Sequence, residues 1–272
     1  MTNPIKTLLL AVVLLLGMSE AGFAQVTLLE DISFERSSLF SMDEGDVLED
    51  HGVITVAEGL FARRESFEAV RHSDGRRTVT SVSVGLNNPY RVEGRWSYDS
   101  DGQAVSATGK ANYDGLPADV SIRANPPTAT ISVRSISEDR SVIAPCNPDC
   151  LIDLAPSALP MFSMTRQFRG EFHDRQTYRW IAHALIVDQS LLEGRAELEL
   201  HKTQFVLGER VSQYIFVETM KNEDSGEITS FPFNLYVTTD HSPLAFATKG
   251  GTVGTRSGFE LLVDKMPPVF WD

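Results

Sequence analysis

The sequence is poor in cysteine and histidine and lacks the common catalytic motifs. Only two of its 272 residues are cysteine and six are histidine. It contains no G-x-S-x-G elbow, no H-E-x-x-H pair, no phosphate-binding glycine loop and no EF-hand loop. These absences argue against the familiar hydrolase, zinc-protease, nucleotide-binding and calcium-binding classes. We therefore predict a non-enzymatic protein with no catalytic residues, no cofactor and no metal.

Basic residues are also scarce. The chain has 24 lysines and arginines against 37 aspartates and glutamates, which gives a net charge of −13 and a pI near 4.9. Nucleic acids and anionic membrane surfaces attract positive patches. The charge balance therefore argues against nucleic acid as a partner.

Long apolar runs are absent except at the N-terminus. Lys6 precedes the run Thr7 to Met18, and small residues Gly22 and Ala24 follow it. This layout is typical of a secretory signal peptide, and the run is short for a membrane span. We expect cleavage near Ala24 and a single periplasmic or secreted domain over residues 25–272, with no transmembrane anchor after processing.

The two cysteines, Cys146 and Cys150, flank the turn-forming residues Asn147-Pro148-Asp149. In an oxidising compartment this arrangement predicts a disulfide that closes a small loop. The alternative is a C-x-x-x-C copper or thiol-exchange site. Such a site needs a distant histidine and a βαβ frame, and no βαβ pattern surrounds the cysteines.

Alternation of apolar and polar residues with a period of two dominates the rest of the chain. Turn signals such as Asp74-Gly75 and Asp101-Gly102 interrupt it about every 8 to 15 residues. This pattern is typical of antiparallel β structure, with roughly eleven to thirteen strands and no helix longer than two turns. The sequence predicts an all-β fold.

The segment from Asp153 to Phe168 breaks this pattern. Asp153 could cap a short helical turn with Pro156 near its first position, while Pro160 prevents a long helix. We expect this short, proline-broken segment to cross the concave face of a sheet. It is either a core plug or a lid over an apolar ligand groove.

The strand that follows this segment is apolar on both faces. Such a strand must be covered on both sides or line a cavity. Its histidine, His183, is expected in the core or groove rather than as a ligand. If a groove exists, the candidate ligand-binding residues are Leu159, Met161, Phe162, Met164, Tyr178 and Trp180.

A second candidate site lies on "GRAELELHK", where alternation puts Glu197, Glu199 and His201 on one face. A neighbouring strand could add Glu171 and His173. Carboxylates with imidazoles could hold a metal or perform acid–base chemistry. The alternative is the solvated face of an antiparallel strand, which needs no further assumption.

The two halves of the chain, joined at about residues 143–168, resemble each other weakly. With an offset of 140, Trp96 aligns with Tyr236 and Ala107-Thr108 with Ala247-Thr248. The domain could therefore consist of two similar halves.

The second half resembles the periplasmic family called domain of unknown function 3108, mainly over residues 150–264. The similarity rests on Asp153, Ser157 and Leu159, then Arg166, the strand "YRWIAHALI", and a closing pattern of Tyr236, Asp240, Pro243 and Gly254 to Gly258. Ala155-Pro156 and the cysteines depart from the family pattern. The resemblance implies an open, strongly curved antiparallel sheet, a half-barrel like those of lipoprotein carriers.

Together these features favour an exported envelope protein that binds a lipid-like apolar ligand, or a hydrophobic segment of a protein partner, in the concave face. The alternative is a structural or protein–protein interaction module whose core is filled by its own side chains. A metal-dependent hydrolase is the third hypothesis.

Overall fold

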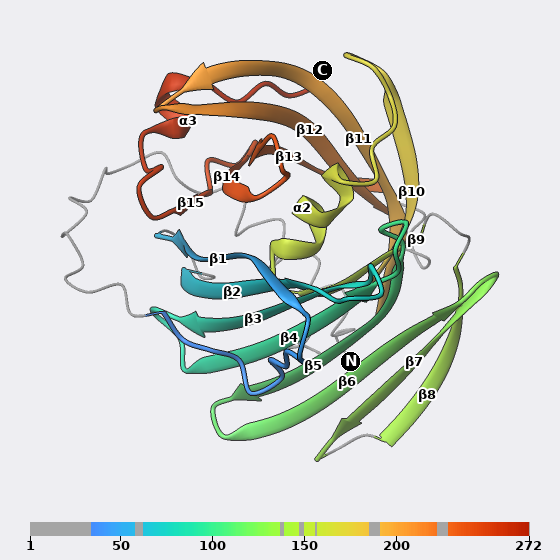
Figure 1. Cartoon of the computed structure of the whole chain (residues 1–272). Helices are drawn as coiled ribbons and strands as arrows, with labels where there is room; N and C mark the ends of the chain where they lie inside the picture. Colours follow the sequence, from blue (N-terminus) through green and yellow to red (C-terminus); the bar gives the residue numbers. More distant parts are fainter. Residues whose placement is uncertain are drawn as a thin grey trace, which may run out of the picture.

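The computed structural model describes residues 34–57, 62–136, 139–146, 150–155, 157–184, 191–221 and 228–271. One sheet of 15 strands forms most of this part of the chain, together with two short helices (Figure 1). The elements are β1 (Val47–Val56), β2 (Arg63–Arg71), β3 (Arg77–Gly85), β4 (Tyr90–Tyr98), β5 (Ala104–Tyr113), β6 (Leu116–Asn125), β7 (Thr128–Ser135), β8 (Asp139–Pro145), β9 (Cys150–Ala155), α2 (Leu159–Thr165), β10 (Arg175–Ala184), β11 (Leu191–Val206), β12 (Glu209–Lys221), β13 (Ile228–Thr238), β14 (Pro243–Thr248), β15 (Val253–Arg256) and α3 (Leu262–Lys265).

The first and last strands lie side by side in the middle of the sheet. β1 pairs with β15 in antiparallel fashion, with Ile54 opposite Arg256 and Val56 opposite Gly254. From this seam, β2 to β8 follow in one direction and β14 to β10 in the other, each strand antiparallel to its neighbour. β9 then pairs with β10 in parallel. The chain therefore builds two meanders that grow away from a common seam.

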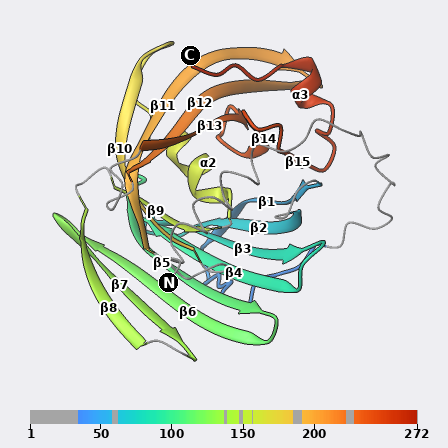
Figure 2. The ribbon, with the colours of Figure 1, turned by 180° about the vertical axis from the view of Figure 1, so that it is seen from behind.

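The sheet curls until β9, at one edge, lies against β5 (Figures 1 and 2). Strands β6, β7 and β8 continue past this overlap as a wing. Leu151, Ile152 and Leu154 of β9 are all buried although successive side chains point to opposite faces. β9 is thus covered on both sides, which explains why its residues other than Asp153 are apolar or cysteine.

Helix α2 fills the space inside the curl (Figure 1). All seven of its residues are buried, and Ala158 is its N-cap. Pro160 lies in the first turn, where a missing N–H costs nothing, so it starts the helix rather than breaking it. Asp153 does not cap this helix, as the sequence suggested, because it belongs to β9. The carboxylate at the start of the helix is instead that of the buried Glu65. It accepts hydrogen bonds from the Ser157 hydroxyl (2.5 Å) and the Ala158 N–H (3.3 Å).

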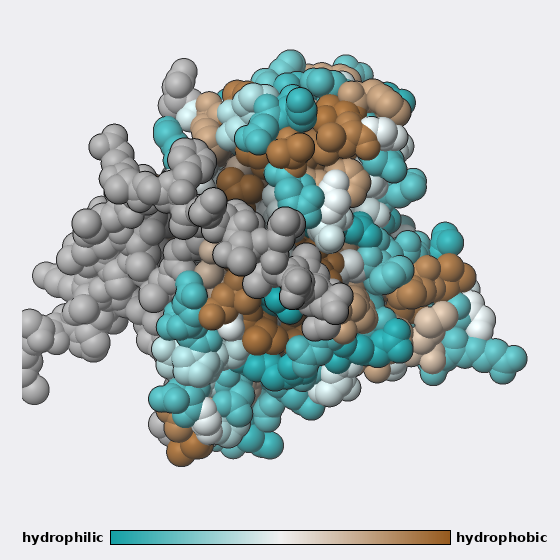
Figure 3. Space-filling view, turned by 90° about the vertical axis from the view of Figure 1, so that its left-hand side faces the viewer, coloured by the Kyte–Doolittle hydropathy of each residue, from teal (hydrophilic) through white to brown (hydrophobic). Residues whose placement is uncertain are grey.

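A second, smaller core lies on the outer face of β13 and β14. α3 and the C-terminal tail cover it, and the tail is held by Asn234, whose side chain exchanges two hydrogen bonds with the Val269 backbone (2.6 and 3.0 Å). The buried side chains of this cluster are Val206, Val211, Tyr236, Leu244, Ala245, Ala247, Leu262 and Met266. From the side of α3 and β15, exposed apolar residues form several separate patches among polar ones (Figure 3).

The segment before β1 covers the outer face of β2, β3 and β4. Arg36 makes an ion pair with the buried Glu68, and Ser37 and Ser38 both donate to the Glu93 carboxylate. The Glu35 N–H donates to the Ser66 hydroxyl at 3.1 Å. These bonds satisfy carboxylates that would otherwise be buried without partners.

The structure confirms the all-β class and the open, curved sheet. Gly75 and Gly102 have φ near +85° at their hairpin turns, as the Asp-Gly signals predicted. The sequence indicated eleven to thirteen strands, whereas the sheet has 15. In β1, the acidic residues Glu49 and Asp50 pair with Arg77 and Arg256.

Two expectations about the chain's organisation stay predictions. The predicted signal peptide, 1–24, lies outside the described residues. The proposed equivalence of Trp96 and Tyr236 places one side chain in the inner core and the other in the outer cluster. Among the described residues, no helix is both long and apolar enough to cross a bilayer.

Candidate functional site

Strand β11 presents Glu197, Glu199 and His201 on the outer face of the sheet. Ala196 and Leu198, which alternate with them, are fully buried on the inner face. The sequence therefore assigned the two faces of this strand correctly. The inner side chains fix the strand against the core, and the polar ones lie on the opposite face.

A β-bulge and a tight turn bring two histidines together on this outer face. The register between β11 and β12 shifts between Leu200 and Lys202, so His201 is the residue added by the bulge. His173 lies in the turn before β10 with φ of +68°, and its N–H donates to the Leu200 carbonyl at 3.0 Å. Residues other than glycine rarely adopt this conformation. Those that do are found disproportionately at functional sites. The sequence expected a strand here, so the turn is a correction.

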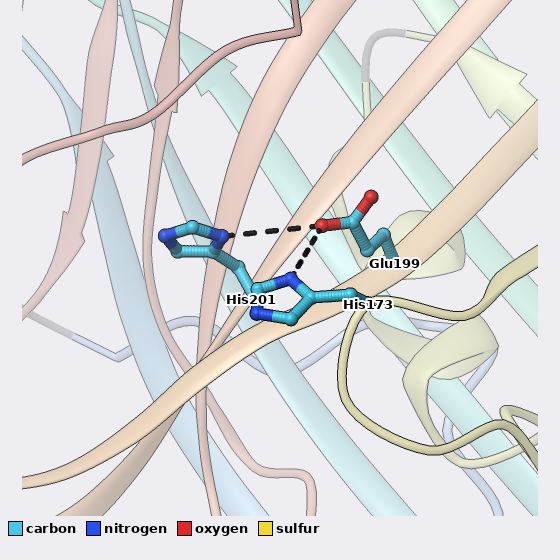
Figure 4. Close-up of side chains that lie close together, drawn as sticks. All are labelled: His173, Glu199 and His201. Atoms are coloured by element: carbon cyan, nitrogen blue, oxygen red, sulfur yellow. Dashed lines mark hydrogen bonds and ion pairs between the residues drawn. The ribbon is translucent and has the colours of Figure 1, made fainter.

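The side chains of His173, Glu199 and His201 converge on one point (Figure 4). Nδ1 of His173 lies 3.2 Å from Glu199 Oε1, and Nδ1 of His201 lies 3.9 Å from the same oxygen. One nitrogen or oxygen atom from each residue lies within 4.8 Å of the others. Glu199 is buried, while His173 is largely exposed, so the cluster opens to solvent on one side.

The second oxygen of Glu199 is held by two groups that the sequence analysis did not single out. The Trp271 indole N–H donates to Oε2 at 2.9 Å, and Arg175 Nε lies 3.3 Å from it. The Arg175 guanidinium also stacks over the Trp271 ring at 3.9 Å. These contacts fix the carboxylate so that Oε1 faces the histidines. Trp271 is remote in sequence, and only its aromatic type could have drawn attention to it.

Burial lowers the pKa of the His201 imidazole, and the nearby His173 ring lowers it further, while Glu199 opposes the shift. A lowered pKa keeps the imidazole neutral near pH 7. Neutral imidazole is the form that binds metal ions.

The other two polar candidates do not join this cluster. Glu197 makes an ion pair with Arg195 on its own strand. Glu171 is exposed, and its N–H donates to Asp174 at 2.8 Å within the turn. The Glu197 carboxylate is thus occupied by Arg195, and the group of converging ligand atoms contains neither residue.

The predicted apolar ligand residues lie in the core. Their side chains face the interior of the curl, and each residue exposes no more than 6 % of its surface. These residues are Leu159, Met161, Phe162, Met164, Tyr178 and Trp180. The cleft beside Leu159 and Phe162 has a volume of about 10 Å³, which is room for one water molecule at most. The side chain of His183 lies outside what the structure describes.

Three buried carboxylates to which the sequence analysis assigned no functional role lie inside the curl, on Glu65, Asp153 and Glu218. Burial raises the pKa of Asp153 to about 7, opposed by the Leu154 N–H and by Arg63. Burial and the charge of Asp153 raise the pKa of Glu218 well above its ordinary value. An alternation pattern identifies inward positions by their apolar residues. It therefore does not reveal a charged residue that occupies an inward position.

The cysteines take no part in either cluster. Cys146 and Cys150 are joined by a disulfide, with 5.4 Å between their Cα atoms, and both are buried. The bonded sulfurs are not thiolate ligands, which argues against the copper alternative.

Comparison with known proteins leaves the chain without a family. No protein-family model matches it, and no curated protein matches it. Among solved structures, it is similar to the crystal structure of a protein of the DUF1089 family from Pseudomonas aeruginosa. The TM-score is 0.39 and the identity 13%, over 82% of this chain and 95% of the other.

Proposed function

We propose that the protein binds a divalent first-row transition metal through His173, Glu199 and His201. The observation that supports this proposal is the approach of two imidazole nitrogens to one carboxylate oxygen, at 3.2 and 3.9 Å. Two ligands bound to one metal at about 2.1 Å in tetrahedral geometry lie about 3.4 Å apart. The side chains are thus close to the spacing of a coordinated set.

The ligand types indicate which metals would bind. Imidazole with carboxylate suits Zn²⁺, Cu²⁺, Ni²⁺ and Fe²⁺ better than Ca²⁺ or Mg²⁺, which prefer all-oxygen sites. Three protein ligands leave at least one position for water or for a group on a partner molecule. The proposal is metal binding without hydrolysis, since the Glu197 carboxylate already pairs with Arg195.

Export remains part of this proposal. The apolar N-terminal segment with small residues before Ala24 supports secretion. An exported protein could sequester or deliver a metal in the cell envelope.

Arg175 sets a limit on the affinity. Its guanidinium lies within ion-pair distance of Glu199 and would repel a bound cation. We expect Arg175→Gln to strengthen metal binding about tenfold, a gain of about 1.4 kcal/mol. A hydrogen-bonding amide retains part of the support for Glu199.

The test uses the chelator-treated full-length protein titrated with Zn²⁺ by calorimetry and with Co²⁺ by visible absorption. We expect one ion per chain and a Co²⁺ spectrum typical of four-coordinate nitrogen and oxygen ligands. His201→Ala and His173→Ala should each weaken binding at least about tenfold. His51→Ala removes an exposed imidazole from β1 and should leave binding unchanged. Equal binding by the His51 and His201 variants would show that the cluster is not the site.

A further inference from the structure

One arginine at the C-terminal end of α2 has no partner of its own. Arg166 is the C-cap residue of this helix. Within the described ranges no carboxylate lies at ion-pair distance from its guanidinium, and its buried Nε has no hydrogen-bond partner. A buried donor without a partner is costly unless a ligand supplies one.

The charges around Arg166 do not neutralise it. Glu49 already pairs with Arg71 and Arg77, and Asp50 pairs with Arg256. Asp240 is exposed at the β13–β14 turn, where water screens it.

Arg77, Arg169 and His241 face the same region, and the positive charge comes from the arginines, because burial and the charge of Arg166 lower the pKa of His241 to about 4. His241 is tied to Thr165 by a hydrogen bond of 3.0 Å, and Arg169 donates to the Arg166 carbonyl. Burial and the neighbouring charge of Arg77 together lower the pKa of Arg166 to about 10. The site therefore carries an excess of positive charge held near apolar surface.

This basic cluster borders an apolar cleft. Arg77, Ser163 and His241 line the cleft, and the rest of its wall is apolar, contributed by Phe67, Ala69, Val79, Leu159, Phe162 and Pro243. An anionic group at the arginines would thus sit beside a surface suited to hydrocarbon. Phe162 would have to move for a chain to enter, since the cleft itself is small.

We propose that the mouth of this cleft binds an amphiphilic anion, with a carboxylate or phosphate group at Arg166 and Arg77 and the apolar chain against α2. Guanidinium groups bind both kinds of oxyanion in bidentate fashion. This site is separate from the metal cluster and supplies a ligand chemistry for the concave face.

The test measures binding of sodium decanoate and decyl phosphate to the full-length protein by calorimetry. Decanol and sodium acetate are the matched probes that lack the charge or the chain. We expect one of the two anionic amphiphiles to bind at least about tenfold more tightly than decanol and acetate. The tighter of the two identifies the head group. If decanol bound as tightly as the anionic amphiphiles, the arginines would have no role. If acetate bound as tightly, the apolar wall would have none.

Variants separate this site from general charge effects. Arg166→Gln should weaken binding about tenfold, whereas Arg123→Gln, which removes an exposed charge from β6, should change it less than about twofold. Arg166→Lys keeps the charge but loses the planar donors and should give an intermediate loss; it also serves if Arg166→Gln does not fold. His201→Ala should bind the amphiphile normally. If Arg166→Lys and Arg123→Gln both bind as the unaltered protein does, the proposal is wrong.

Discussion

Inside the curl, a negative charge on Asp153 or on Glu218 makes ionisation of the other carboxyl group less favourable. Asp153 faces Glu65 and Arg63 of β2, Glu218 of β12 and the Trp180 indole of β10. Arg63 lies 3.7 Å from Glu65, so its charge is shared with another carboxylate. A protonated Asp153 avoids placing a further negative charge in this apolar space.

This arrangement predicts that stability falls as the pH rises. The pKa of Asp153 is 3.8 as its ordinary value and about 7 in the folded protein, so between these values the folded state binds more protons than the unfolded state. The resulting stabilisation amounts to about 4 kcal/mol at most. It is complete below about pH 4 and is lost as the pH rises through about 7. Glu218 acts in the same direction.

Urea denaturation at pH 5 and pH 8 would measure this dependence. Asp153→Asn should flatten it, because an amide does not titrate, and Asp153→Asn with Glu218→Gln should flatten it further. Glu197→Gln, on the outer face, is the control and should leave the difference intact. An unchanged slope in the double variant would show that other groups cause it.

At the scale of elements, α2 is a plug for the curled sheet. Its seven residues are buried, and Glu65 caps its start. The helix is too short to be stable alone. Its position depends on packing, and its removal would leave the interior of the curl empty.

Phe162→Ala should therefore lower the free energy of unfolding by about 3 to 5 kcal/mol, as for other buried phenylalanines. Phe162 is only 2 % exposed. Denaturant unfolding measures the loss, with Phe172→Ala, an exposed residue before β10, as the control. A change smaller than about 1 kcal/mol would instead favour a lid that leaves the sheet intact when it opens.

The sequence predicted the faces of individual strands better than the contacts between residues that are distant in the chain. The alternation on β11 correctly placed Ala196 and Leu198 inward because that signal depends only on neighbouring residues. The approach of His173 to Glu199 depends on a left-handed turn and a bulge, which no alternation pattern reveals. The contact of Trp271 with Glu199 joins residues 72 positions apart and depends on the path of the whole tail.

At the scale of the whole molecule, the link from β8 to β9 connects the two edges of the sheet. β8 is the outer edge of the wing, and β9 is the edge that tucks against β5. The disulfide between Cys146 and Cys150 lies in this link. It ties the residue that follows β8 directly to the first residue of β9.

Replacing both cysteines, Cys146→Ser with Cys150→Ser, should lower the free energy of unfolding by about 2 kcal/mol, because the closed loop is short. Thermal unfolding in non-reducing buffer measures this, and mass spectrometry of the unreduced protein should show no free thiol. Two free thiols in the native protein would contradict the structure. Reductant should have no effect on the double variant, which serves as the control.

The seam between β1 and β15 also determines how the molecule responds to force. Because the strands are antiparallel and Ile54 lies opposite Arg256, the entering and leaving ends of the chain lie at the same end of the seam. Tension applied across residues 34 and 271 would first peel the two terminal segments from the outer face. It would then open the seam one residue pair at a time, as in a zipper, and so at low force. The two meanders would separate while each kept its own hairpins.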